Sequence, residues 1–148
     1  MTIRKAQIKD SVSLVENNLR MAYETEGKRL NKIILQKGVS AVLKFPEKGF
    51  YLIAEINGTV AGSLMITNEW SDWRNSTFWW IQSVYVLPEF RKKGIYRKLY
   101  REVKRLAKKE KNVCGIRLYV EKNNIKAQKV YEKTGMECSH YIMFEVES

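Results

Sequence analysis

One stretch of the sequence, residues 79–100 (WWIQSVYVLPEFRKKGIYRKLY), limits the possible folds more than any other. Its first eight residues are mostly apolar and aromatic, which is typical of a buried strand. A short turn follows, and then Arg91, Lys92, Lys93 and Gly94 precede an amphipathic helix. The first N–H groups of a helix have no partner inside it, and the helix dipole makes that end positive. The stretch therefore predicts a strand, a turn and a helix that together hold a phosphate group.

The rest of the sequence predicts an α/β domain of the α+β type. We expect one mixed, mainly antiparallel sheet of about six to seven strands, flanked by about four helices. Asn57-Gly58 is a strong two-residue hairpin signal, and Gly38 is expected to divide the second helical region. The expected strands lie at residues 2–7, 50–56, 60–67, 79–86, 116–120 and 141–146. The expected helices begin after Asp10, near Leu30, after Gly94 and at Asn123 or Asn124, and the last ends near Gly135.

The size and composition are those of an ordinary globular protein. With 148 residues, of which 45% are hydrophobic, the chain is expected to form one domain, 1–148. No stretch approaches the roughly 18–20 apolar residues of a membrane span, and the amino terminus lacks a signal peptide. Cys114 and Cys138 form neither a disulfide pattern nor a metal-ligand spacing. A cytoplasmic protein without a metal is therefore expected.

The net charge of +11 is the one compositional outlier. It suits a nucleic acid, an anionic membrane surface or an anionic small molecule. Eleven of the 27 Lys and Arg residues fall between Arg91 and Lys111, directly after the turn described above. A nucleic-acid-binding module would interleave aromatic residues with these cations, but residues 97–111 contain only Tyr100. A basic nucleic-acid-binding module is therefore the weaker interpretation and stays open as an alternative, and neither a nucleic-acid nor a membrane partner is expected.

Two segments together resemble the GNAT superfamily of N-acetyltransferases. The first, residues 84–96 (VYVLPEFRKKGIY), is similar to that superfamily's acetyl-CoA-binding motif, which ends in Gln/Arg-x-x-Gly-x-Gly/Ala. The second is Leu118-Tyr119-Val120 followed by an Asn-x-x-Ala-x-x-x-Tyr-x-x-x-Gly pattern. Its members here are Asn124, Ala127, Tyr131 and Gly135. The resemblance implies a GNAT fold with a splayed central pair of strands, and an enzyme that moves an acetyl group from acetyl-CoA to a primary amine.

The resemblance also implies roles for individual residues. Backbone groups of Val84 and Val86 would pair with pantetheine, and the Val86 N–H would donate to the thioester oxygen. Asn124 would contact pantetheine, and Tyr131 would protonate the leaving thiolate. The full set of implied cofactor-binding residues is Val84, Tyr85, Val86, Arg91, Lys92, Lys93, Gly94, Ile95, Tyr96, Arg97, Asn124, Ala127 and Tyr131.

Tyr96 is a departure from the family pattern, which has glycine or alanine at that position. A helical backbone accepts tyrosine there, so its N–H stays available to a phosphate. The ring is expected to reshape the mouth of the cofactor cleft.

The acceptor side is less constrained by the sequence. Glu69 and Asp72, beside two tryptophans, either bind the amine or accept its proton, or else belong to a loop that covers the sheet edge. Glu24 and Glu26 are weaker candidates. The acceptor is a small-molecule or peptide amine, and a homodimer through the sheet edge or the final strand is compatible with the sequence. An acyl-CoA-binding sensor of the same fold, without turnover, stays open as an alternative.

Overall fold

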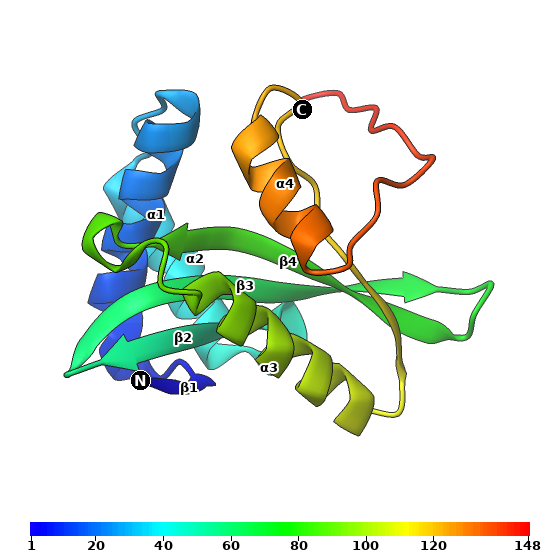
Figure 1. The fold of residues 1–148 in the computed structure, drawn as a ribbon, viewed down its shortest axis with the longest axis horizontal. Helices are drawn as coiled ribbons and strands as arrows, with labels where there is room; N and C mark the ends of the chain where they lie inside the picture. Colours follow the sequence, from blue (N-terminus) through cyan, green and yellow to red (C-terminus); the bar gives the residue numbers. More distant parts are fainter.

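The protein folds around one five-stranded sheet whose strands lie in chain order (Figure 1). In the computed structural model, which describes residues 1–148, the first four strands are antiparallel and the fifth runs parallel to the fourth. The strands are β1 (Thr2–Lys5), β2 (Phe50–Ile56), β3 (Thr59–Ser71), β4 (Ser76–Val86) and β5 (Val113–Arg117). The α-helices are α1 (Ser11–Glu26), α2 (Lys32–Lys44), α3 (Ile95–Lys109) and α4 (Ile125–Lys133).

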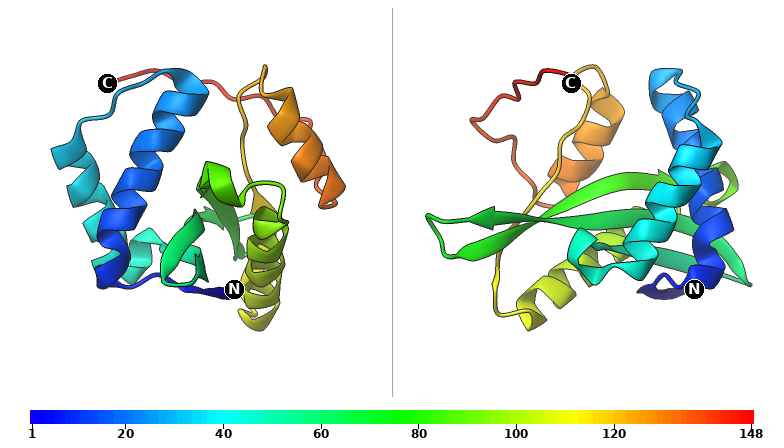
Figure 2. Two further views of the ribbon diagram at one scale, coloured as in Figure 1. Left: turned by 60° about the vertical axis from the view of Figure 1, so that its left-hand side comes forward. Right: turned by 180° about the vertical axis from the view of Figure 1, so that it is seen from behind.

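The helices cover both faces of the sheet. Helices α1 and α2 lie on one face, whereas α3 and α4 lie on the other (Figure 2). Each face has its own core, because successive strand residues point to opposite sides. Leu99 and Val103 of α3 pack on one face and are fully buried. Leu14 and Val39, from α1 and α2, pack on the other. None of the helices is both long enough and apolar enough to cross a membrane.

The mixed α/β fold with a mainly antiparallel sheet and four α-helices is confirmed. The hairpin between β2 and β3 turns at Asn57-Gly58, where both residues have positive φ (49° and 76°). Turns of this kind match the right-handed twist of the strands that they join.

The expected number of strands was wrong: the sheet has five, not six to seven. Residues 141–146 (YIMFEV) are mostly apolar, yet they form no strand, because they pair with no edge of the sheet within the chain. The expected strand at 116–120 instead spans Val113–Arg117. It pairs only with Thr77–Trp80 of β4, after which the two strands diverge.

Other expected boundaries also differ from the structure. Helix α2 runs without a break through Gly38, since an interior glycine costs only about 1 kcal/mol. Residues 68–75 are not a loop: β3 continues to Ser71 and the turn occupies residues 72–75 only. Pairing of Glu69 with Phe78 and of Trp70 with Thr77 extends the hairpin despite its polar composition. Strand β1 ends at Lys5 rather than at residue 7.

Candidate active site

The turn between β4 and α3 presents six consecutive backbone N–H groups that have no acceptor within the chain. From Lys92 to Arg97, no backbone N–H donates to a carbonyl or to a side chain. The next N–H, that of Lys98, donates to the Gly94 carbonyl at 3.1 Å and begins the helical hydrogen-bond series. All the residues from Arg91 to Gly94 are exposed. These donors, together with the positive end of the α3 dipole, form a site for an anion.

The backbone conformation of this turn turns its donors toward one another. Lys92 and Gly94 both lie in the left-handed region, with φ of 63° and 73°. Alternation of right- and left-handed residues makes successive N–H groups converge on a concave surface that binds anions. Lysine rarely takes a positive φ, so the turn holds Lys92 in a conformation of higher energy.

Strand β4 has an unpaired edge directly before this turn. Pairing between β4 and β5 ends at Trp80 and Arg117, and a bulge follows in which Ser83 has φ of 53°. The Leu87 N–H donates to the Ala61 carbonyl at 2.9 Å, toward β3. Because successive residues of a strand point to opposite edges, Val86 directs its N–H and carbonyl away from β3, into the gap that β5 has left. The splayed strand pair and the anion site are therefore continuous.

Arg91 is held by Glu24 of α1, so part of its charge is directed away from the turn. Its guanidinium donates to a Glu24 carboxylate oxygen at 2.7 Å and to the Val86 carbonyl at 2.9 Å. The Tyr85 hydroxyl donates to the other Glu24 oxygen, also at 2.7 Å. Partial burial acts to raise the pKa of Glu24, but the hydrogen bonds from Tyr85 and Arg91 outweigh it and hold that pKa below its usual value. Glu24 thus ties the end of α1 to the turn between β4 and α3.

We expect the Glu24→Gln variant to be less stable than the parent at neutral pH by at most about 1 kcal/mol, as for other exposed ion pairs. The folded-state pKa of Glu24 is depressed, so its stabilisation is complete above the unfolded pKa of about 4.3 and is lost as the pH falls through the folded value. The difference in Tm between parent and variant, measured at a series of pH values, should therefore shrink below about pH 4.

Glu26→Gln is the matched control for this experiment. Glu26 lies two residues after Glu24, at the end of the same helix, and its only ion pair is a 3.8 Å contact with Lys28. Its Tm difference from the parent should be small at every pH. A Tm difference for Glu24→Gln that is the same at neutral and acidic pH would contradict the role of the ionised carboxylate.

Tyr96 fills the space between the beginning of α3 and the end of α4. Its ring stacks on Tyr100 at 6.0 Å and meets the Tyr131 ring edge-on at 5.6 Å. The Tyr96 hydroxyl is buried and has no hydrogen-bond partner. The neighbouring Thr134 hydroxyl donates instead to the Tyr131 carbonyl at 2.6 Å. The residue that departs from the family pattern therefore supports the ring of Tyr131.

Tyr131 keeps its proton at neutral pH. Burial raises the pKa of its phenol above the usual value. Asn124, seven residues earlier, caps α4: its side-chain oxygen accepts from the Ala127 N–H at 3.2 Å. This bond leaves the amide NH₂ of Asn124 free to donate to a ligand.

A basic cavity of about 170 Å³ lies between α3 and the end of α4. Arg97, Arg101 and Lys104 line it from α3, and Lys133 lines it from α4. The run of cations on α3 is evident from the sequence, but the contribution of Lys133 is not. The cavity lies next to Tyr96 and extends the positive surface beyond the anion-binding turn.

Glu69 lies at the point where β4 and β5 separate. Its carboxylate accepts from the Arg117 guanidinium at 2.9 Å and from the Trp80 indole at 3.1 Å. Arg117 also lies 3.6 Å above the centre of the Phe78 ring. Gln82, two residues beyond Trp80, donates to the Thr67 hydroxyl at 2.7 Å. The structure thus joins Glu69 to Arg117, a partner that could not be identified from the sequence.

Asp72 lies apart from these residues. It is exposed in the turn of the β3–β4 hairpin, where its carboxylate accepts from the Trp73 N–H at 2.9 Å. Met65, the pairing partner of Gln82, precedes it by seven residues of extended chain, on the order of 20 Å. Trp73 is 92% exposed, so this turn covers no sheet edge. The structure groups Glu69 with the splayed strands and leaves Asp72 at the hairpin tip.

Comparison with known proteins identifies the family to which the chain belongs. Residues 15–136 match the model of the acetyltransferase (GNAT) family. A possible acetyltransferase from Clostridium difficile 630 is 44% identical, with a TM-score of 0.94, and the match covers 99% of this chain and 97% of that one. A predicted acetyltransferase from Clostridium acetobutylicum, solved with acetyl-CoA, is 24% identical with a TM-score of 0.79, over 97% and 95% of the two chains. No curated protein matches the sequence.

The fold is that of an acetyltransferase. The chain belongs to the GNAT acetyltransferase family, and the resemblance noted in the sequence is confirmed. A more distant likeness, to AAC(6')-Iy in complex with a bisubstrate analogue (18% identity, TM-score 0.79, 99% and 97% coverage), extends to the fold alone.

Proposed function

We propose that this chain is an N-acetyltransferase domain, 1–148, that moves the acetyl group of acetyl-CoA to a primary amine by direct attack in a ternary complex. One observation carries the proposal: six free backbone N–H groups at the start of α3 directly follow the unpaired edge of β4. The pyrophosphate of an acyl-CoA would bind the free N–H groups, and its amide-bearing arm would pair with the edge of β4. The relative from Clostridium acetobutylicum, with acetyl-CoA in its structure, agrees with this choice of donor.

The residues present fit this donor. Backbone N–H groups from Lys92 to Arg97 would hold the pyrophosphate, with Lys93 adding charge and Arg91 fixing the turn through Glu24. The cavity lined by Arg97, Arg101, Lys104 and Lys133 would take the remaining phosphate. Backbone groups of Val84 and Val86 would pair with the pantetheine arm, and the free amide NH₂ of Asn124 would donate to it.

Two groups of the chain would act on the thioester. The Val86 N–H points into the gap and is placed to donate to the oxygen on which negative charge develops. Tyr131, protonated at neutral pH, would give its proton to the departing thiolate. No covalent acyl-enzyme is proposed, since neither cysteine is paired with an activating base. Holding amine and thioester side by side would supply much of the rate enhancement.

Glu69 would bind the acceptor amine rather than take its proton. Two hydrogen bonds from Arg117 and Trp80 already engage one of its oxygens. The other oxygen is free to accept from an ammonium or amine. We propose Glu69 as the amine-binding residue, and water ordered by Gln82 as the route by which the proton leaves. Asp72, at the hairpin tip, would meet only an acceptor long enough to reach it.

The acceptor class proposed is a small-molecule or peptide amine. A nucleic-acid partner is not proposed, because Tyr100, the one aromatic in residues 97–111, is 8% exposed and cannot stack on bases. We also propose a cytosolic location, since both cysteines are free thiols. A homodimer is proposed because residues 141–146 leave an apolar segment exposed.

We expect acetyl-CoA to stabilise the protein against heat. A ligand at about 100 times its Kd adds roughly 2.7 kcal/mol to the free energy of unfolding, which gives a clear rise in Tm. The measurement compares acetyl-CoA, CoA and a short DNA duplex at physiological salt, and then follows CoA release with a panel of amines. Stabilisation by DNA and not by acetyl-CoA would overturn the proposal. Stabilisation by acetyl-CoA without CoA release from any amine would favour a sensor.

A further inference from the structure

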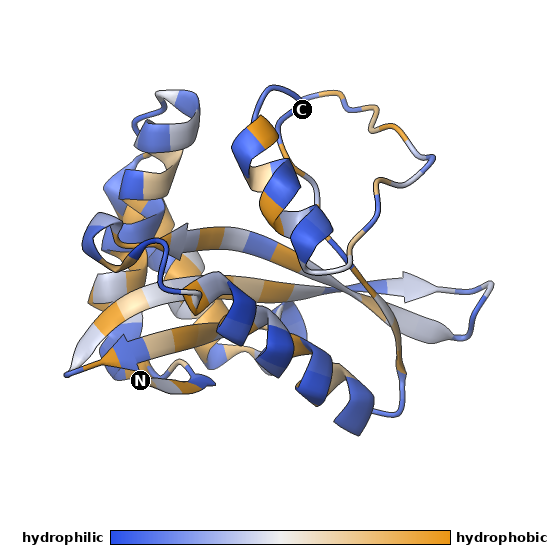
Figure 3. Ribbon diagram, viewed as in Figure 1, coloured by the Kyte–Doolittle hydropathy of each residue, from blue (hydrophilic) through white to orange (hydrophobic).

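Four side chains, called here the acceptor cluster, lie together on the face of the sheet opposite α3: Glu69, Phe78, Trp80 and Arg117. Trp79 packs in the core beneath α3, so its neighbour Trp80 points to the other face. The β3–β4 hairpin changes from hydrophobic residues near the helices to hydrophilic ones at its end (Figure 3). The cluster therefore lies where the core gives way to a polar surface.

Arg117 carries hydrogen-bond donors that the fold does not use. A guanidinium has five N–H groups, and the chain engages one nitrogen of this one, Nη1, which donates to Glu69 at 2.9 Å. The other arginines in ion pairs each donate through two nitrogens; they are Arg4, Arg91 and Arg105. The Arg117 side chain is 34% exposed, so a ligand can reach its remaining N–H groups.

An aromatic ring holds this guanidinium in place. It lies 3.6 Å above the centre of the Phe78 ring, which is 8% exposed. Phe78 pairs with Gly115 of β5, where a Cβ would lie only 2.7 Å from the ring. The glycine thus makes room for the ring on which Arg117 rests. Stacking fixes the plane of a guanidinium, and its fork of donors then matches the two oxygens of a carboxylate.

Glu69 presents the opposite charge beside these donors. One of its oxygens accepts from Arg117 and from the Trp80 indole, and the other accepts nothing within the chain. The Trp80 ring lies 5.9 Å from the ring of Tyr119, which is 62% exposed. A free carboxylate oxygen, a free guanidinium edge and an aromatic surface therefore lie side by side.

We propose that the acceptor is an amino acid whose ammonium group binds Glu69 and whose carboxylate binds the free donors of Arg117. The rings of Trp80 and Tyr119 contact its side chain. The inference rests on the proposed acetyl transfer and names its acceptor. A zwitterion matches both charges of the cluster at once. The net charge of +11 agrees, since long-range repulsion slows the approach of a polycation, whereas a carboxylate is attracted.

The acceptor cluster lies where β4 and β5 separate. Trp80 and Arg117 are the last paired residues of the two strands, and the gap proposed for the pantetheine arm begins beyond them. The amino nitrogen approaches the thioester from the face opposite α3. Its bond to the acetyl carbon forms as the C–S bond breaks, and the thiolate takes a proton from Tyr131. The products are the N-acetyl amino acid, CoA and one proton.

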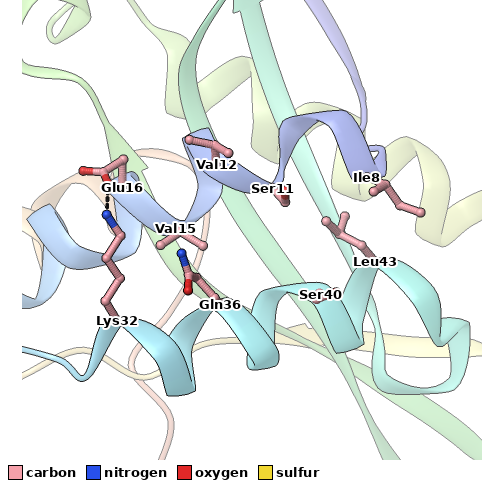
Figure 4. A pocket seen from close by; sticks show the side chains of 9 residues that line it. All are labelled: Ile8, Ser11, Val12, Val15, Glu16, Lys32, Gln36, Ser40 and Leu43. Carbon is pink, nitrogen blue, oxygen red and sulfur yellow. Dashed lines mark hydrogen bonds and ion pairs between the residues drawn. The ribbon is translucent and has the colours of Figure 1, made fainter.

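A larger cavity elsewhere does not offer this chemistry. It has a volume of about 310 Å³ and lies between α1 and α2, with no residue of β4 or β5 in its lining (Figure 4). Its one carboxylate, that of Glu16, is paired with Lys32 at 3.2 Å. Because no part of β4 lines this cavity, an amine bound in it would lie away from the proposed position of the thioester.

The test compares common amino acids with their amides, which keep the amine and lack the carboxylate. With acetyl-CoA in excess, CoA release gives kcat/KM for both members of each pair. The carboxylate raises the pKa of the neighbouring amine and so lowers its reactive fraction, which means that intrinsic reactivity favours the amide. We expect the parent to prefer at least one amino acid to its amide by about 10- to 100-fold, as for a hydrogen bond to a charged group.

Arg117→Met should lose most of that preference, because it removes every donor and keeps an apolar contact with Phe78. Arg117→Lys should keep part of it through its charge. Glu69→Gln should lower kcat/KM for acid and amide alike, so that their ratio is unchanged. Arg74→Met is the matched control: Arg74 also lies over the Phe78 ring, at 5.3 Å, but is exposed in the hairpin turn and should leave both values unchanged. Tm shows that each variant folds.

Three results would overturn the inference. These are a parent that uses every amide at least as well as its acid, an Arg117→Met variant that loses both activities equally, and a parent that releases CoA with spermidine but with no amino acid. The second would reduce Arg117 to a residue that orients Glu69. Each of the three leaves the proposed acetyl transfer intact. Only the absence of CoA release from every amine would remove that function, and the inference with it.

Discussion

Replacing Tyr131 by phenylalanine should lower kcat by about 100-fold, at the lower end of the range for a general acid, while the Kd for acetyl-CoA stays nearly unchanged. The substitution removes one hydroxyl and keeps the ring that packs edge-on against Tyr96 at 5.6 Å. Burial raises the pKa of the Tyr131 phenol, so the group is protonated and ready to donate at neutral pH. Without it, the thiolate must leave unprotonated or take a proton from water.

The pH profile separates this role from a structural one. In the parent, kcat should fall at alkaline pH as the Tyr131 phenol loses its proton, at a pH above the usual phenol value because the pKa is raised. That descending limb should vanish in Tyr131→Phe. Tyr23→Phe is the matched control, since Tyr23 is 56% exposed on α1 and lies outside the site. An unchanged kcat across the whole pH range would remove Tyr131 from the acid role.

The elements that could be predicted from sequence are those whose cause is local. The β4–α3 turn, the hairpin at Asn57-Gly58 and the α4 cap at Asn124 each depend on a few neighbouring residues, and the structure contains all three. The exact bounds of β2 were also predicted, because its pattern and its turn agree. Local structures of this kind depend on consecutive residues and can be predicted without the rest of the fold.

The features that could not be predicted depend on residues far apart in the chain. Arg91 was expected to add charge to a phosphate site, and nothing local indicates that Glu24, 67 residues earlier, engages its guanidinium. Glu69 likewise meets Arg117 across 48 residues. Residues 141–146 are rich in the aromatic and apolar residues that favour a strand, but such a segment forms a strand only where it pairs with a sheet edge. The strand count was wrong for this reason.

Tyr96 departs from the family pattern, and the structure shows how its ring is accommodated. The sequence predicted a bulky ring at the mouth of the cleft, and the structure shows that ring stacked on Tyr100 and against Tyr131. The backbone N–H of Tyr96 is still free, because it lies in the first turn of α3, where N–H groups have no acceptor inside the helix. The cost is a buried hydroxyl without a partner, which in other proteins destabilises by about 1–3 kcal/mol.

Val86→Pro should reduce kcat/KM by about 10²- to 10³-fold, as the loss of one oxyanion donor does in other enzymes. Proline has no N–H, so the substitution removes the donor proposed for the thioester oxygen and leaves the Val86 carbonyl that Arg91 holds. The sheet should tolerate it, since the Val86 N–H faces away from β3 and no ladder hydrogen bond is lost.

Val86→Ala is the matched control, because it shortens the same side chain and keeps the N–H. It should retain activity within about threefold of the parent, as expected when a contact outside the developing charge is trimmed. Tm and acetyl-CoA binding are measured for both variants, so that a loss of folding is told apart from a loss of catalysis. If the two variants lost activity equally, with both folded, the side chain of Val86 and not its N–H would be the group that matters. If only the proline variant lost activity, the backbone of β4 would be part of the catalytic machinery, and its splay from β5 would be what exposes that backbone to the thioester.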